Sequence, residues 1–119
     1  MSTRLEKLRA LLIEEISDII LRELKDPRLG FITVIDAEIT PDLQHAKVFV
    51  SIMGSKEEQA INLAVLRRSA HFVRQSFGKR IKMKVLPDFD FVLDESVERG
   101  VRMFELLQQI QRDDDDQGT

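Results

Sequence analysis

Basic side chains dominate one stretch of this sequence, and their type and spacing suit contacts with phosphate groups. Residues 59–87 contain no aspartate or glutamate. The same stretch holds Arg67, Arg68, Arg74, Lys79, Arg80, Lys82 and Lys84. Lysine and arginine neutralise phosphates and release their counterions, so a segment of one sign favours a polyanion as partner. A solvated helix face would explain the same charges, and charge alone does not decide between the two.

The overall charge hides this pattern. The formal net charge is -3, but four consecutive aspartates occupy residues 113–116. Removing those four from the 21 acidic residues leaves 17 against 18 basic ones, which is a net charge of +1. The distribution of charge along the chain is therefore more informative than its sum.

Two further pairs of basic residues are candidates for the same chemistry. Lys25 and Arg28 belong to residues 25–30, whose proline and glycine predict a helix stop and a turn. The turn explains its own proline and glycine, whereas Lys25 and Arg28 fit either exposure or phosphate binding. Arg4 and Lys7 stand near the start of a predicted helix, where positive charge opposes the helix dipole. That placement hints at an external anion, although solvation explains it more simply.

The other polar side chains offer little for catalysis or metal binding. Asp88 and Asp90 share one face of a predicted strand, but no histidine or third ligand is spaced with them. His45 and His71 are far apart, and the chain contains no cysteine. No nucleophile, base and orienting group occur together. We therefore expect no enzyme activity, no metal site and no cofactor.

Hydrophobic spacing predicts the elements that position these side chains. Apolar residues at helical intervals predict a first helix that ends near residue 24. Two runs rich in β-branched residues, 31–40 and 45–53, predict an antiparallel hairpin. Ser55 and Glu58 form a capping box at the start of a second helical segment, which we expect to end at Gly78.

The last third of the chain predicts a strand and a final helix. Residues 80–86 alternate apolar and basic, which predicts a strand with Lys82 and Lys84 on one face, continued beyond Pro87 to residue 93. A helix beginning near residue 96 would carry an apolar stripe of Val97, Val101, Phe104, Leu107 and Ile110. We expect one domain over residues 1–111 and a disordered acidic tail over residues 112–119.

This order of elements indicates an α+β fold. It consists of helix, strand, strand, helix, helix and strand, with one C-terminal helix added. We expect a three-stranded mixed sheet with the helices on one face. No signal peptide or membrane-spanning run is visible, which favours a cytoplasmic protein.

The order matches the type II KH domain, and three blocks resemble the ribosome-binding factor A family more closely. The blocks are ELKDPRLGFITV at residues 23–34, PDLQHAKVFVS at residues 41–51, and the run from FVR to LPDFDFVLDES within residues 72–96. The resemblance covers about residues 5–110. It implies a type II KH-like fold and makes the basic segment the expected RNA-binding surface.

The resemblance also marks a kink between two helices at Ser69, Ala70 and His71. The family usually has Ala-x-Gly there, so His71 stands where glycine is usual. A kink that required positive φ would penalise histidine. The family lacks the Gly-x-x-Gly loop by which ordinary KH domains clamp a nucleic-acid backbone, and this sequence lacks it too.

The function that the resemblance implies is non-catalytic ribosome assembly. Such a protein binds the free or immature 30S small ribosomal subunit through 16S rRNA, and assists late maturation and processing of the rRNA 5′ end. The resemblance also implies a role in adaptation to cold and a monomeric state. It implies other assembly factors, such as an assembly GTPase, as partners. A generic KH-type RNA-binding protein and a protein-interaction module are the alternatives.

Overall fold

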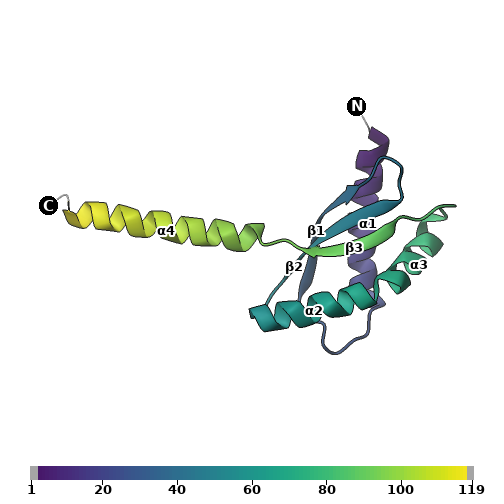
Figure 1. Ribbon diagram of the computed structural model, residues 1–119, viewed down its shortest axis with the longest axis horizontal. Helices are drawn as coiled ribbons and strands as arrows, with labels where there is room; N and C mark the ends of the chain where they lie inside the picture. The colour runs from purple at the N-terminus through teal and green to yellow at the C-terminus, as the bar shows by residue number, and fades with distance from the viewer. Residues whose placement is uncertain (1–2, 118–119) are drawn as a thin grey trace.

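The computed structural model of the chain describes residues 3–117, and for residues 3, 97–99 and 113–117 it describes the backbone alone. The elements follow the predicted order (Figure 1): α1 Thr3–Arg22, β1 Ile32–Ile39, β2 His45–Ile52, α2 Lys56–Arg68, α3 Ala70–Ile81, β3 Asp88–Leu93 and α4 Ser96–Gln117. The predicted α+β class is confirmed, as are the hairpin and the break between the second and third helices.

The sheet has the strand order β1-β2-β3, with β1 and β2 antiparallel and β2 and β3 parallel. Only one of its faces is buried. On β2 the predicted alternation holds, because Ala46, Val48, Val50 and Ile52 are all buried while Lys47 is exposed. The mixed sheet with its helices on one face is therefore confirmed.

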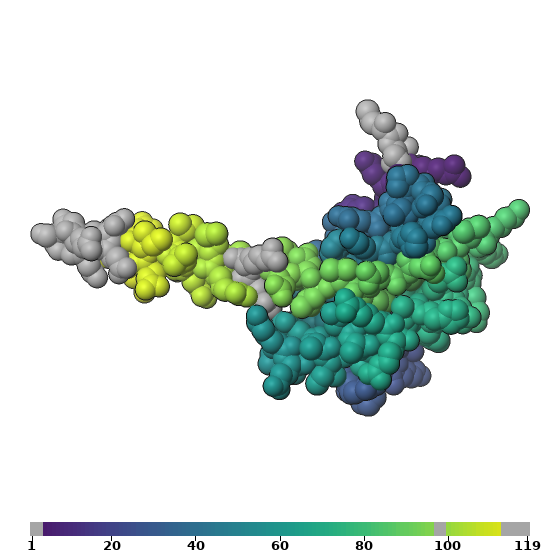
Figure 2. All heavy atoms as spheres, in the orientation of Figure 1, coloured from purple at the N-terminus to yellow at the C-terminus, as the bar shows by residue number. Residues whose placement is uncertain are grey.

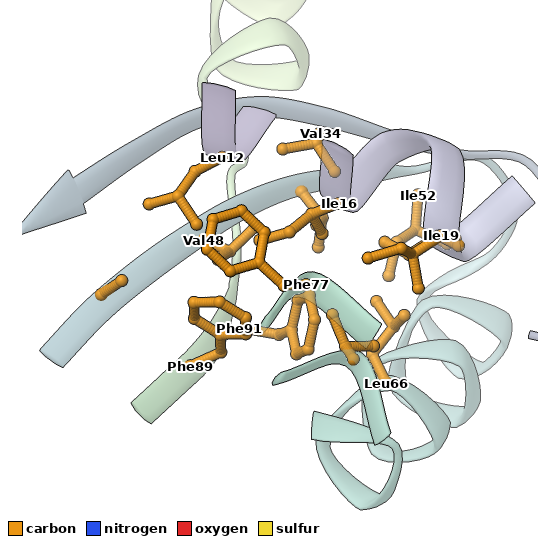
Figure 3. Packing of buried hydrophobic residues seen from close by; sticks show 14 residues of the cluster. Leu12, Ile16, Ile19, Val34, Val48, Ile52, Leu66, Phe77, Phe89 and Phe91 are labelled. Carbon is orange, nitrogen blue, oxygen red and sulfur yellow. The ribbon is translucent and has the colours of Figure 1, made fainter. Parts of the chain in front are cut away.

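Helices α1 and α3 supply most of the opposing surface (Figure 3). Leu12, Ile16 and Ile19 of α1 have no exposed surface and face the sheet. The rings of Phe77 on α3 and Phe89 on β3 meet edge to face, with centroids 5.6 Å apart. Each buried side chain of this size contributes about 1.5–3 kcal/mol to folding. These contacts hold the helices against the sheet.

A bulge in β1 changes which residues face the core. Val34 pairs with Val50 and Asp36 pairs with Phe49, so Ile35 is an extra residue in the strand. The next buried residue after Val34 is consequently Ala37, three positions along, where strict alternation would bury residues two positions apart. The bulge turns Asp36 toward α1, where it accepts a hydrogen bond from Arg9 Nε at 2.7 Å.

The strand predicted over residues 80–86 is wrong, and so is the helix stop at Gly78. Helix α3 continues to Ile81, which packs against the core, and ends at Lys82 in the left-handed conformation with φ 58°. An irregular α3–β3 connection, residues 82–87, then leads to β3. Lys82 and Lys84 therefore share no strand face. Gly78 has a different role, because the Leu86 side chain packs directly on its bare Cα.

The contact between Gly78 and Leu86 generates a prediction. Gly78→Ala should lower the free energy of unfolding by about 1 kcal/mol, because crowding Leu86 costs about 1–3 kcal/mol and exceeds the gain in helix propensity of about 1 kcal/mol. In a Leu86→Ala background the same substitution should instead stabilise by about 1 kcal/mol. Urea denaturation of the four proteins measures both effects. Equal stabilisation in the two backgrounds would contradict the contact.

Helix α4 differs from the expectation in length and in packing. Its backbone is helical to Gln117, whereas the sequence predicted a disordered acidic tail over residues 112–119; residues 118–119 lie outside the described part. The helix projects away from the sheet and the other helices (Figures 1 and 2). Val101 is 52% exposed and Phe104 is 61% exposed, so this part of the predicted stripe covers nothing. The packed body therefore ends with β3.

We predict that the acidic end of α4 contributes nothing to the stability of the body. A chain that stops after Arg112 should unfold within about 0.5 kcal/mol of the full chain, and its melting temperature should move by less than about 4 °C. The physical reason is that α4 is separate from the core. Thermal unfolding followed by circular dichroism tests this, and a larger fall would show a stabilising contact.

Candidate nucleic-acid interface

The break between α2 and α3 occurs at a residue with negative φ. Ser69 has φ -88° and ψ 0°, and its N–H donates to the carbonyl oxygen atoms of Val65 and Leu66 at 3.0 and 3.1 Å. His71 lies in the first turn of α3 and has no positive φ. The bend therefore needs no glycine here, and His71 carries no left-handed strain.

Arg80 is held by α1 and is poorly placed to bind phosphate. Its Nη1 donates to Glu15 Oε2 at 2.9 Å and to Asp18 Oδ2 at 2.8 Å, and its Nη2 donates to Glu23 Oε2 at 2.8 Å. Asp18 also accepts from Arg22 Nε at 2.6 Å. We call these five residues the α1–α3 ion network. It contains three carboxylates and two guanidinium groups, so its formal charge is negative.

The protonation equilibria reflect this network. Arg80 donates hydrogen bonds to the carboxylates, and these raise the pKa of Arg80 above its ordinary value. The hydrogen bond to Glu15 has the largest effect. The hydrogen bond from Arg80 lowers the pKa of Asp18 below 3.8. Arg80 and Asp18 are therefore both charged at neutral pH. The segment without acids in the sequence lies beside the acids of α1 in space.

Arg74 and Arg67 are also engaged within the protein. Arg74 donates from Nη2 to Leu86 O at 3.0 Å and from Nε to Pro87 O at 3.2 Å, and its Nε lies 3.5 Å from a carboxylate oxygen of Asp88. Arg67 donates from Nε to Phe91 O at 3.2 Å. These arginines fasten the α3–β3 connection and β3 to the helices, which is a structural role.

The turn after α1 is organised by Arg28. Its Nη2 and Nε donate to the two oxygens of Asp26 at 2.6 and 3.0 Å, and its backbone N–H donates to Oδ1 at 2.9 Å. The Arg28 side chain is the main cause that lowers the pKa of Asp26 to about 2, and the charge of Arg68 adds to it. Arg68 therefore lies close to this turn. Asn62 anchors the turn to α2 by accepting from the N–H of Gly30 at 2.8 Å.

The side chains of the remaining basic candidates are exposed, and within residues 4–112 they form no hydrogen bond or ion pair. Apart from Lys79, they fall into two groups. Lys25 and Arg68 lie at the turn after α1, together with Arg28. We call the second group the basic end: Arg4 and Lys7 at the start of α1, and Lys82 and Lys84 on the α3–β3 connection. Lys79 belongs to neither group, because it lies in the last turn of α3 beside Arg80. Helix α1 separates the two groups by about 30 Å, at 1.5 Å per residue.

The basic end forms where three segments converge. Arg4, Leu5 and Leu8 of α1 line one surface hollow together with Pro41 and Leu43 of the β1–β2 turn and Met83 of the α3–β3 connection. Leu43 has φ 62°, a conformation that costs a non-glycine residue about 1–2 kcal/mol. Leu43 and Met83 were not among the residues predicted from the sequence, because no pattern along the chain marks a contact between these segments.

The described residues show neither a metal site nor a membrane span. Among the side chains that the structure describes, no group of three or more histidine, cysteine, aspartate or glutamate residues is placed to hold a metal ion. In the same part of the chain, no helix is long and apolar enough to span a membrane.

Comparison with known proteins identifies the family of this chain. The family model of ribosome-binding factor A matches residues 4–107. The chain belongs to the ribosome-binding factor A family. A ribosome-binding factor A of Thermodesulfovibrio yellowstonii is 45% identical over 109 residues, covering 92% of each chain. That of Aromatoleum aromaticum is 48% identical over 101 residues, covering 85% of this chain and 80% of its own.

Solved structures of ribosome-binding factor A share the fold. The crystal structure from Thermus thermophilus superposes with a TM-score of 0.69 at 25% identity, covering 77% of this chain and 97% of the Thermus chain. A homology model of the Thermus factor, fitted into a cryo-electron microscopy map of a 30S complex, gives 0.63 at 26% identity over 75% of this chain and 93% of that one. The family match stops short of residues 113–116, the acidic end of α4.

The α1–α3 ion network generates a prediction about stability. Arg80→Met should lower the melting temperature by several degrees at neutral pH, because three carboxylates lose their shared cation while the methylene packing remains. Lys79→Met, at the neighbouring exposed position, should leave it unchanged. The folded pKa of Asp18 lies below 3.8, so its stabilisation is complete above that pH and is lost as pH falls through the lowered value. The difference between wild type and Arg80→Met should therefore shrink on acidification. If Arg80→Met and Lys79→Met had the same melting temperature at neutral pH, a stabilising network would be excluded.

Proposed function

We propose that this chain binds the small ribosomal subunit through 16S rRNA, and that the basic end makes the phosphate contacts. The observation that carries the proposal is that the start of α1 and the α3–β3 connection meet at one hollow, and that each carries exposed basic side chains beside it. The ammonium groups of Lys82 and Lys84 form no hydrogen bond or ion pair with residues 4–112, so their charges are available to phosphates. The family supplies the target, because its Thermus member was fitted into a 30S complex.

The chemistry at this surface suits recognition of RNA shape over RNA sequence. The chain has no tryptophan or tyrosine, and Phe77, Phe89 and Phe91 are buried in the core. Phe31, Phe72 and Phe104 are exposed, but none of them lines the hollow at the basic end. Aromatic platforms for stacking successive bases are therefore scarce. Phosphate contacts would position the protein on the subunit. Its binding energy would favour one rRNA conformer, which is a shift of population without catalysis.

The finer role follows from the same proposal. By holding one conformer of immature 16S rRNA, the protein assists late maturation of the 30S subunit and processing of the rRNA 5′ end. It acts on free subunits in the cytoplasm as a monomer, and its importance increases in the cold, where misfolded rRNA rearranges slowly. A protein partner such as an assembly GTPase would find apolar side chains on the exposed face of α4.

The proposal predicts a charge-reversal phenotype. Lys82→Glu combined with Lys84→Glu should weaken binding to isolated small subunits at least tenfold, because attraction to phosphates is replaced by repulsion. The slope of log affinity against log salt should fall by roughly 0.7–0.9 for each phosphate that the variant no longer neutralises. Co-sedimentation over a salt series measures both quantities. Arg74 and Arg80 are left intact, since their internal contacts would confound the result.

A matched control separates this effect from overall charge. Lys56→Glu combined with Arg112→Glu changes the net charge by the same amount at exposed positions on α2 and α4, away from the basic end. We expect nearly wild-type affinity and salt slope. If both double variants lost affinity equally, the contact would be non-specific attraction. If neither did, attention would move to Lys25, Arg28 and Arg68.

A further inference from the structure

The surface hollow at the basic end has the size and composition of a small ligand site. Its volume is about 460 Å³, and five of its six lining residues, all except Arg4, are apolar. Ligand sites commonly measure about 300–1,000 Å³ and combine an apolar floor with a few polar groups. An occupant of this hollow should therefore be apolar itself and carry negative charge nearby.

The backbone is strained at two places that border the hollow. Leu43 and Lys82 are the only non-glycine residues with positive φ in the described chain. Strained residues persist where the surrounding structure holds them, and they gather at binding sites. At Leu43, the N–H donates to Thr40 O at 2.8 Å, and Asp42 accepts from Thr40 Oγ1 at 2.7 Å. The β1–β2 turn thus holds a bulky apolar side chain at a position suited to glycine or asparagine.

The second strained residue arranges the α3–β3 connection around the hollow. At Lys82 the chain leaves α3 in a left-handed turn, with its N–H donating to Gly78 O at 2.9 Å. Met83 then lines the hollow and is half-buried, whereas Lys82 and Lys84 are exposed on either side of it. An apolar side chain thus lies between two ammonium groups along the chain. This arrangement complements a base flanked by two phosphates.

We propose that the hollow receives one unstacked nucleobase of single-stranded RNA. The inference rests on the proposed function and deepens it, because it adds a base contact to the phosphate contacts. Leu5, Leu8 and Leu43 cover the edges of the base. The thioether of Met83 and the guanidinium of Arg4 suit the face of an aromatic ring. Lys82 and Lys84 bind the flanking phosphates.

One acidic group at the hollow restricts how the RNA strand runs. Asp42 adjoins Leu43, and hydrogen bonds from the Thr40 hydroxyl and then the Gln44 N–H lower its pKa, so it is ionised at neutral pH. Its charge repels phosphate from the β1–β2 turn. The RNA backbone therefore passes between the start of α1 and the α3–β3 connection. An apolar side chain of a protein would also fit the hollow, but the surrounding lysines favour a polyanion.

The sharpest variant is Leu43→Gly, because glycine relieves the positive φ and removes one wall of the hollow. Its melting temperature should equal or exceed that of the wild type. The probes are a single-stranded adenylate oligoribonucleotide of about ten nucleotides, within the usual site size, and the same backbone without bases. The full-length wild type should bind the base-containing probe about tenfold more tightly, as expected for one stacked base. Leu43→Gly should bind the two probes nearly equally and keep its salt slope.

Val85→Ala is the matched control. Val85 is 64% exposed in the same connection but does not line the hollow. This variant should retain the wild-type preference for bases. If wild type and Leu43→Gly show the same preference, or if Val85→Ala loses it as Leu43→Gly does, the hollow is not the base site.

A second measurement does not depend on the Leu43 variant. Because the chain has no tryptophan or tyrosine, Met83→Trp places a single fluorophore at the hollow. The base-containing probe should quench its emission by stacking, and the abasic probe should not. Equal quenching by both probes would overturn the inference. So would emission that changes with protein concentration alone, which would assign the hollow to a second copy of the chain.

Failure of this inference can be told apart from failure of the proposed function. Suppose that the wild type binds small subunits, that Lys82→Glu with Lys84→Glu abolishes this binding, and that the wild type binds the two RNA probes equally. This result would overturn the base site alone. Loss of the base preference in Leu43→Gly, with charge reversal leaving subunit binding unchanged, would support the hollow as an RNA site and reject the subunit contact.

Discussion

Burial of a single sheet face is the constraint on which the rest of this structure depends. Three strands present Val48, Phe91 and their neighbours to one side, and α1 and α3 must both reach that side to exclude water. Because α1 and α3 cover the same face, they become neighbours, and the carboxylates of one meet the guanidinium of Arg80 on the other. The same packing brings the start of α1, the β1–β2 turn and the α3–β3 connection to one end. The candidate interface is thus a by-product of how the core closes.

Local patterns in the sequence predicted the elements whose causes are local. The capping box at Ser55 and Glu58 forms as expected, with both reciprocal contacts present, and the alternation of β2 identified its buried face. The bulge at Ile35 could not be predicted, because it depends on pairing with β2. Residues 80–86 were misassigned because alternation over so few residues is compatible with the end of a helix followed by an irregular connection. Tertiary packing of Ile81 and Leu86 decided between them.

The candidate site was harder to predict, because the partners of a charged side chain depend on the three-dimensional fold and not on its neighbours in the sequence. A segment without acids along the chain suggested seven equivalent basic residues, but α1 supplies acids from a distant part of the sequence. Arg80 consequently binds carboxylates of α1, and Arg74 and Arg67 bind carbonyl groups between Leu86 and Phe91. The lysines of the α3–β3 connection keep their charge exposed, whereas the arginines beside packed elements bind other parts of the protein. This division agrees with arginine's rigid, multiply donating guanidinium group and lysine's single, strongly hydrated charge.

The projecting helix α4 separates charge over a long distance. The molecule extends 68 Å along its longest axis. Four aspartates occupy residues 113–116 near the tip of α4, and the α3–β3 connection lies at the other end of that axis (Figure 1). A run of negative charge and the exposed lysines of the α3–β3 connection therefore lie at opposite ends of the long axis. Near a polyanion, a molecule with this separation of charge experiences a torque before it makes any contact. It would rotate to arrive with its lysines leading and its aspartates trailing, so that encounters are oriented from the start.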